Sequence, residues 1–154
     1  MKHVLVGFCT DKRDRISTLI CWATWWRHSH VVLISPDRRY IIEATHGKGV
    51  VISTLAEFMT RDRAEIRRIP HPDPAKCWER ALTQAGKPYD WKYSWAWVFR
   101  RRDWQDENAW ACIEIVAWAG EWFTDQAAGS ITARELWLIS EPAGCCAPTS
   151  RRCG

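Results

Sequence analysis

Short apolar runs of strand length recur through the first half of the chain, separated by turn residues. The second and third runs flank Ser35-Pro36-Asp37-Arg38, in which proline takes the second position of a type I turn. The runs are rich in β-branched residues and are predicted to form neighbouring antiparallel strands. They cover residues 4–9, 31–34, 40–44, 50–53 and 65–69.

Segments of helical length accompany the strands. Asp73, followed by proline, predicts the N-cap of a helix over residues 74–85 that stops at Gly86. Thr132 begins a capping-box sequence and predicts a last short helix. Further helices are expected over residues 16–26 and 109–126, with a helical turn at 55–61. The order favours the α+β class, with an antiparallel sheet packed against helices.

The length of 154 residues suits one domain with a real core. We expect this domain over residues 1–140 and an irregular tail over residues 141–154, where Pro, Gly and Cys are concentrated. The spacing of Cys145, Cys146 and Cys153 matches no common zinc module, so we expect no metal and no cofactor. A metal or iron–sulfur site in the tail is the alternative.

The composition excludes several classes of protein. The net charge of +4 is too small to predict a nucleic-acid partner. The sequence contains no run of about 18 apolar residues, so no transmembrane helix is predicted. The first residues predict a strand and not a secretion signal. Seven cysteines without such a signal indicate mostly free thiols. The 12 tryptophans suit a core, an interface or a stacking cleft equally well.

The predicted hairpin around residues 35–38 brings two polar residues together. If these four residues form the turn, residues whose numbers sum to 73 are paired, so His30 faces Glu43, with Cβ atoms roughly 5 Å apart. A carboxylate there fixes the imidazole tautomer and stabilises the imidazolium, as a general base requires. A purely structural pair is the alternative, and His28, two positions earlier, is the competing base.

Cys112 lies near the start of the helix expected over residues 109–126, which Asn108 or Asp106 is expected to cap. The positive end of a helix lowers the pKa of a thiol, and the thiolate is the nucleophilic form. A nearby imidazole would complete a nucleophile–base pair. The alternative is a buried thiol between Trp110 and Val116 that only fills the core.

Six short motifs occur in one order along the chain. They are "HVVLI" from His30, "IIEA" with Glu43, Gly49-Val50, "GKPYDW" at 86–91, "CIEI" from Cys112, and "ITARELW". In this order, over roughly residues 28–139, the chain resembles the circularly permuted branch of the NlpC-like, papain-fold thiol hydrolases.

The resemblance implies a permuted papain-like domain with the activity of a cysteine peptidase or amidase. It implies that Cys112 is the nucleophile, His30 the base and Glu43 the orienting residue. It also implies that Tyr89 lines the substrate cleft, and we expect Trp91 and Trp110 there too. Two positions depart from the family pattern without removing a catalytic group: Ile113 replaces the usual Ser, and Ala133 replaces the usual Pro.

The resemblance further implies peptidoglycan stem peptides as the substrate. Because the cell wall lies outside the cytoplasm and no secretion signal is recognised, we expect a phage tail tip to carry the enzyme, with other tail proteins as partners. The expected location is the virion tail or the cytoplasm of the producing cell. One alternative is a lipid acyl hydrolase or acyltransferase, whose cleft "LICWATWW" would line. Another is a structural tail protein with a vestigial site.

Overall fold

A six-stranded antiparallel sheet forms the centre of the computed structural model, which describes residues 2–10, 21, 26–89, 111–123 and 131–144. The strand order is β4-β3-β2-β1-β5-β6, so neighbours in the sequence are mostly neighbours in the sheet. The strands are β1 (His3–Thr10), β2 (His30–Ile34), β3 (Tyr40–Thr45), β4 (Gly49–Thr54), β5 (Asp62–Pro70) and β6 (Glu141–Pro142). The five predicted strands are confirmed, and the α+β class is confirmed with them.

Within the described ranges, four helices pack on this sheet: α2 (Leu55–Phe58), α3 (Pro74–Leu82), α5 (Cys112–Gly120) and α7 (Ala133–Leu138). The predicted caps are present, since Asp73 accepts the Lys76 N–H at 3.2 Å and Thr132 forms a capping box. Helix α3 ends three residues earlier than predicted, because residues 83–86 form tight turns that bring Gly86 into hydrogen-bonding contact with β4. The helix expected over residues 16–26 lies outside the described residues, except for Cys21 and Trp26.

The prediction of a helix over residues 109–126 is wrong at both ends. Ala111, in an extended conformation, is the N-cap of α5, so neither Asn108 nor Asp106 caps it. The carboxylate of Glu114 accepts the Ala111 N–H at 3.3 Å, which fixes this start from inside the helix. The helix ends at Gly120, and Glu121 turns the chain with a φ of 50°. The Trp122 indole folds onto Gly120 in space that a Cβ atom would occupy.

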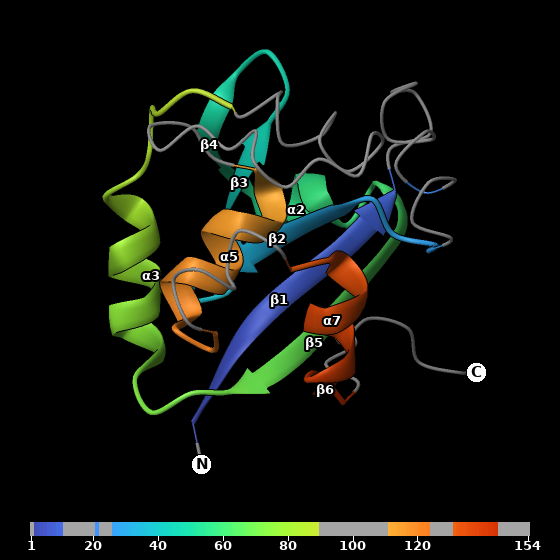
Figure 1. Cartoon of the computed structure of the whole chain (residues 1–154), viewed down its shortest axis with the longest axis vertical. Helices are drawn as coiled ribbons and strands as arrows, with labels where there is room; N and C mark the ends of the chain where they lie inside the picture. The colour runs from blue at the N-terminus through green and yellow to red at the C-terminus, as the bar shows by residue number, and fades with distance from the viewer. Residues whose placement is uncertain (1, 11–20, 22–25, 90–110, 124–130, 145–154) are drawn as a thin grey trace, which may run out of the picture.

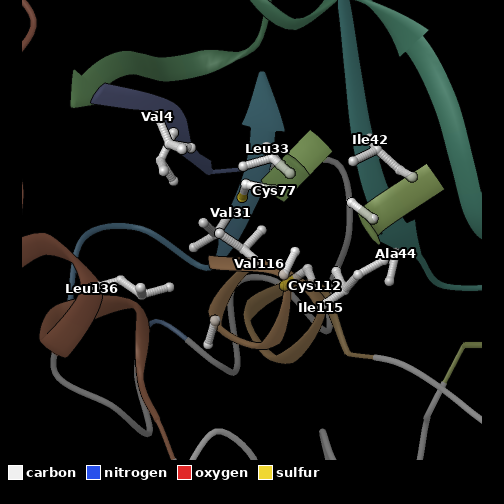
Figure 2. Packing of buried hydrophobic residues seen from close by; sticks show 14 of the residues in the cluster. Val4, Val31, Leu33, Ile42, Ala44, Cys77, Cys112, Ile115, Val116 and Leu136 are labelled. Atoms are coloured by element: carbon white, nitrogen blue, oxygen red, sulfur yellow. The ribbon is translucent and has the colours of Figure 1, made fainter. Parts of the chain in front are cut away.

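Helices α3, α5 and α7 cover one face of the sheet, and Figure 1 shows α5 between the other two. Side chains alternate between the faces along each strand. Val31, Leu33, Ile42 and Ala44 point toward α5 and form the larger core cluster (Figure 2). The opposite face packs a smaller cluster under α2, made of Cys9, Val32, Ile34, Ile41 and Phe58.

The register of the β2–β3 hairpin differs from the prediction by two residues. Leu33 pairs with Ile42 instead of Tyr40, although the turn hydrogen bond from Arg38 N–H to Ser35 O is present at 2.9 Å. The buried Ser35 hydroxyl accepts the N–H groups of Arg39 and Tyr40, which lengthens the loop. A shift of two residues keeps every side chain on its predicted face, whereas a shift of one would have reversed them.

Strands β2 and β3 pair only near their turn, at Leu33↔Ile42 and Ile34↔Ile41. Beyond this point β2 remains paired with β1 as far as His30, and β3 remains paired with β4 as far as Thr45. The ladder between the two central strands is therefore open at the end that carries His30. Helix α5 packs against both strands.

Gly49-Val50 and residues 86–89, the described part of the "GKPYDW" segment, form one local structure. Val50 N–H donates to Lys87 O at 2.8 Å, and Gly86 N–H donates to Val50 O at 2.9 Å. A Cβ atom on Gly49 would lie 2.3 Å from Lys87 O, and the φ of Gly49 is +76°, so only glycine fits there. Two motifs separated in the sequence thus join as one edge of the sheet.

The first residues of the predicted tail join the sheet, because Glu141 and Pro142 pair with Arg68 and Arg67 of β5. The tail cysteines lie outside the described residues, as do Trp91 and Trp110. In the part of the chain that the structure describes, no helix is long and apolar enough to cross a membrane.

Candidate active site

Cys112 occupies the first position of α5, at the opening between β2 and β3. Its side chain is 6% exposed and packs beside Val31, Ala44 and Ile115 (Figure 2). The sulfur forms a hydrogen bond with the His30 side chain and accepts another from the Val31 N–H. Ser35 N–H points to β3, so the N–H groups at alternate positions, including Val31, point the same way. The sulfur thus takes the acceptor position that a continued β3 ladder would have filled.

The His30 ring lies between Cys112 and Glu43. His30 Nε2 is 2.6 Å from Glu43 Oε2, which leaves Nδ1 as the nitrogen that faces the sulfur. In the observed register these two residues are diagonal neighbours instead of direct partners, a distance that long side chains span. The predicted contact is therefore present although the predicted pairing is wrong.

Glu43 is held from several sides. Arg61 donates from Nη1 to Oε2 and from Nη2 to Oε1, both at 2.6 Å. Ser53 Oγ donates to Oε1 at 3.4 Å. The Glu43 side chain is only 3% exposed, so these contacts replace water around the carboxylate. Its orientation is fixed before any substrate arrives.

The contacts favour the charged form of each group. Burial alone would raise the pKa of the Cys112 thiol, but the charge and hydrogen bond of His30 lower it below its ordinary value. Burial alone would lower the pKa of His30, yet its contacts with Cys112 and Glu43 raise it well above 6.5. Burial also opposes ionisation of Glu43, whose pKa is nevertheless lowered to about 2 by Arg61 and His30. These shifts favour a thiolate beside an imidazolium.

His28, the competing base, belongs to a different environment. It is 2% exposed, its ring stacks on Trp137 with centroids 5.1 Å apart, and neither ring nitrogen has a hydrogen-bond partner among the described residues. Burial lowers its pKa to about 4, assisted by the charges of Arg27, Arg63 and Arg67. A neutral ring packed in an aromatic cluster is suited to the core and not to proton transfer with Cys112.

The low pKa of His28 predicts how stability depends on pH. Because its pKa falls from 6.5 unfolded to about 4 folded, its contribution is complete above pH 6.5 and is lost as pH falls through 4. The free energy of unfolding should drop by up to about 3 kcal/mol across this window. Guanidinium titrations at several pH values measure it. His28→Phe should flatten this dependence, whereas His46→Phe, at an exposed position, should not. An unchanged slope in His28→Phe would contradict the assignment.

Tyr89 lies beside the turn between β3 and β4, at the end of the sheet that carries Glu43. Its ring meets His46 edge-on with centroids 5.7 Å apart, and it packs against the cluster that contains Cys112. This place is compatible with the cleft role expected from the sequence.

Sequence reasoning missed Arg61, Ser53 and the Val31 N–H. Ser53 is a diagonal neighbour of Glu43 across β3 and β4, because Glu43 pairs with Val51, two residues before Ser53. The register of β3 and β4 would have placed Ser53 near the carboxylate. Arg61 follows α2 in a turn, and its sequence carries no signal that links it to Glu43.

The order of these residues along the chain is unusual for a papain-type site. In the papain arrangement the cysteine precedes its histidine and the third polar residue, whereas here His30 and Glu43 precede Cys112. A family model described as "Permuted papain-like amidase enzyme, YaeF/YiiX, C92 family" matches residues 6–117, well over half of the chain. The chain belongs to this family. No curated protein matches the chain.

Membership in the permuted papain-like amidases confirms the resemblance noted in the sequence and the fold that it implied. The protein is a cysteine hydrolase of the amidase or peptidase kind, and its family indicates a substrate that contains a peptide or amide bond. The matched segment begins within β1, includes β2 to β5 and reaches into α5, so it contains His30, Glu43 and Cys112.

Proposed function

We propose that Cys112, His30 and Glu43 form the catalytic triad of a cysteine amidase. The observation that carries this proposal is the position of the His30 ring, which hydrogen bonds to the Cys112 sulfur and, through Nε2, to the Glu43 carboxylate. A buried thiol that only filled the core would need no such partners. The lowered pKa of Cys112 and the raised pKa of His30 support the same roles.

In the first step, the Cys112 thiolate attacks the carbonyl carbon of a bound amide, and the carbonyl oxygen becomes an oxyanion. The Cys112 backbone N–H is a donor for this oxygen, since it is the first residue of α5 and the N-cap residue Ala111 has no side-chain acceptor. The C–N bond then breaks as the His30 imidazolium gives its proton to the leaving amine. A thioester remains on Cys112.

In the second step, neutral His30 takes a proton from water, and the resulting hydroxide attacks the thioester. The C–S bond breaks, the carboxylic acid leaves, and the thiolate–imidazolium pair is restored. Glu43 stays ionised throughout, so it orients the ring and stabilises each imidazolium state without itself exchanging a proton.

For the substrate, we propose peptidoglycan stem peptides, cleaved by an enzyme carried on a phage tail tip. The amidase family and the six ordered motifs support a peptide-type bond. The location in a virion tail, or in the cytoplasm of the producing cell, belongs to the same proposal. A lipid acyl hydrolase is the second candidate, since a thioester intermediate serves ester substrates equally well.

Purified peptidoglycan and mixed micelles of phosphatidylcholine, offered in parallel, test the substrate class. We expect new amino termini to be released from peptidoglycan and no fatty acid to be released from the micelles. Release of fatty acid alone would replace the peptidase proposal with the lipid one. Mass spectrometry of purified virions tests the tail location, and absence of the protein from them would remove it.

A further inference from the structure

We infer that Arg61 is a positioning residue of the candidate site: it fixes the plane of Glu43 and balances its charge, so that Glu43 can hold His30 without opposing the thiolate. This inference rests on the proposed triad. It assigns a fourth side chain, from the face of the sheet opposite α5, to the same chemistry.

Arg61 forms a bidentate ion pair with Glu43. Two guanidinium nitrogens each lie 2.6 Å from a different oxygen of Glu43, so the carboxylate cannot rotate without breaking one of these bonds. Glu43 Oε2 accepts from Arg61 and from His30 at once. Fixing this oxygen therefore fixes Nε2 of the ring and, through the ring, the nitrogen that faces the sulfur.

The chain holds Arg61 firmly in its turn. Its backbone N–H donates to Phe58 O at 3.0 Å, and its guanidinium lies 5.7 Å from the centroid of the Phe58 ring, which is fully buried. A capping box of Thr54 and Glu57 fixes the start of α2, which precedes this turn. Arg61 is also hydrogen bonded to the buried thiol of Cys9, which pairs with His30 across β1 and β2.

The charges around the ring explain why an arginine belongs there. The lowered pKa values of Cys112 and Glu43 favour two anions beside one ring, and the carboxylate by itself raises the pKa of the thiol. One imidazolium cannot balance two buried anions, and Arg61 supplies the second positive charge. Burial raises the pKa of Cys9, so this thiol adds no charge, and Glu57 lies at the exposed rim near Arg61. The four inner groups then sum to zero.

Loss of the Arg61 charge should change the pKa of Cys112 in a definite direction. In Arg61→Gln, the potential of Glu43 acts on the site without compensation, so the thiolate is less favoured and the imidazolium is more favoured. The apparent pKa of Cys112 should rise on the order of one unit. Arg61→Lys keeps the charge but not the bidentate contact, so it should leave this pKa near the wild-type value while the carboxylate loses its fixed plane.

The rate of Cys112 alkylation by iodoacetamide, followed against pH by peptide mass spectrometry, measures the effect without any substrate. We expect the midpoint to move to higher pH in Arg61→Gln and to stay in place in Arg61→Lys. With peptidoglycan as substrate, kcat of Arg61→Lys should fall about tenfold with little change in KM. An unmoved or lowered midpoint in Arg61→Gln, or full turnover in Arg61→Lys, would overturn the inference.

Arg67→Gln is the matched control. Arg67 is also a largely buried arginine with two hydrogen bonds of 2.6 Å, but these go to Ser140, away from the site. It should lower the melting temperature and leave the alkylation midpoint unchanged. If Arg61→Gln does not fold, the Lys variant still decides the role of the bidentate contact. If wild-type Cys112 labels no faster below neutral pH than Cys77, both the triad proposal and the inference about Arg61 are rejected. If the wild-type midpoint is low but does not change in Arg61→Gln, only the inference about Arg61 is rejected.

Discussion

Cys112→Ala is expected to abolish turnover, by a factor on the order of 10⁴ to 10⁶, because no other group of the site forms a covalent bond to the acyl carbon. The fold should remain, since alanine fits the space of the thiol and Val31 loses a single acceptor. Release of amino termini from peptidoglycan measures the activity, and a thermal melt measures the fold.

Cys77→Ala provides a matched control for this variant. Cys77 is 1% exposed in the same core cluster, and burial raises the pKa of its thiol to about 12. It should therefore lose stability to a similar extent and keep full activity. Retained turnover in Cys112→Ala would reject the thiol-hydrolase mechanism altogether, whichever substrate is used.

Glu43→Gln should lower activity by on the order of 10²-fold or more, because the amide stabilises the imidazolium poorly. The fold should lose stability as well, since Glu43 is 2% exposed and bonded to Arg61 on both oxygens. The amide NH₂ would face a guanidinium N–H, at a cost of about 3 kcal/mol in the free energy of unfolding.

Activity of this variant must therefore be measured well below its melting temperature, with guanidinium unfolding run in parallel. Glu65→Gln is the control, because Glu65 pairs with Arg27 and Arg67 at 3.4 Å on the surface and should be neutral in both assays. Wild-type turnover in a folded Glu43→Gln would exclude Glu43 from the triad. His46, which is exposed and contacts Tyr89, would then be the next polar side chain to test.

Local signals in the sequence were sufficient for the strands, for two helix starts and for part of the candidate site. Alternating apolar runs predicted the strands, and Asp73 and Thr132 marked two helix starts correctly, because these effects act within a few residues. The contact of His30 with Glu43 survived an incorrect register because the error was two residues, which preserves the face of a strand.

The errors came from side chains that act on the backbone or across the fold. The Ser35 hydroxyl lengthened the hairpin loop, and Glu114 set the start of α5 from its first turn. Arg61 and Glu43 are brought together by the arrangement of β3, β4 and α2, and no spacing along the chain expresses that contact. Local sequence propensity does not predict such long-range contacts.

Because β2 and β3 separate beside Cys112, the backbone amide of Val31 should report the chemical state of the sulfur. Val31 N–H donates to the Cys112 sulfur, so its proton is deshielded most when that sulfur is anionic. Formation of the thioester removes the negative charge from the acceptor, and hydrolysis returns it. The ¹H–¹⁵N resonance of Val31 is therefore expected to distinguish the free thiolate from the thioester, with no label placed on substrate or nucleophile.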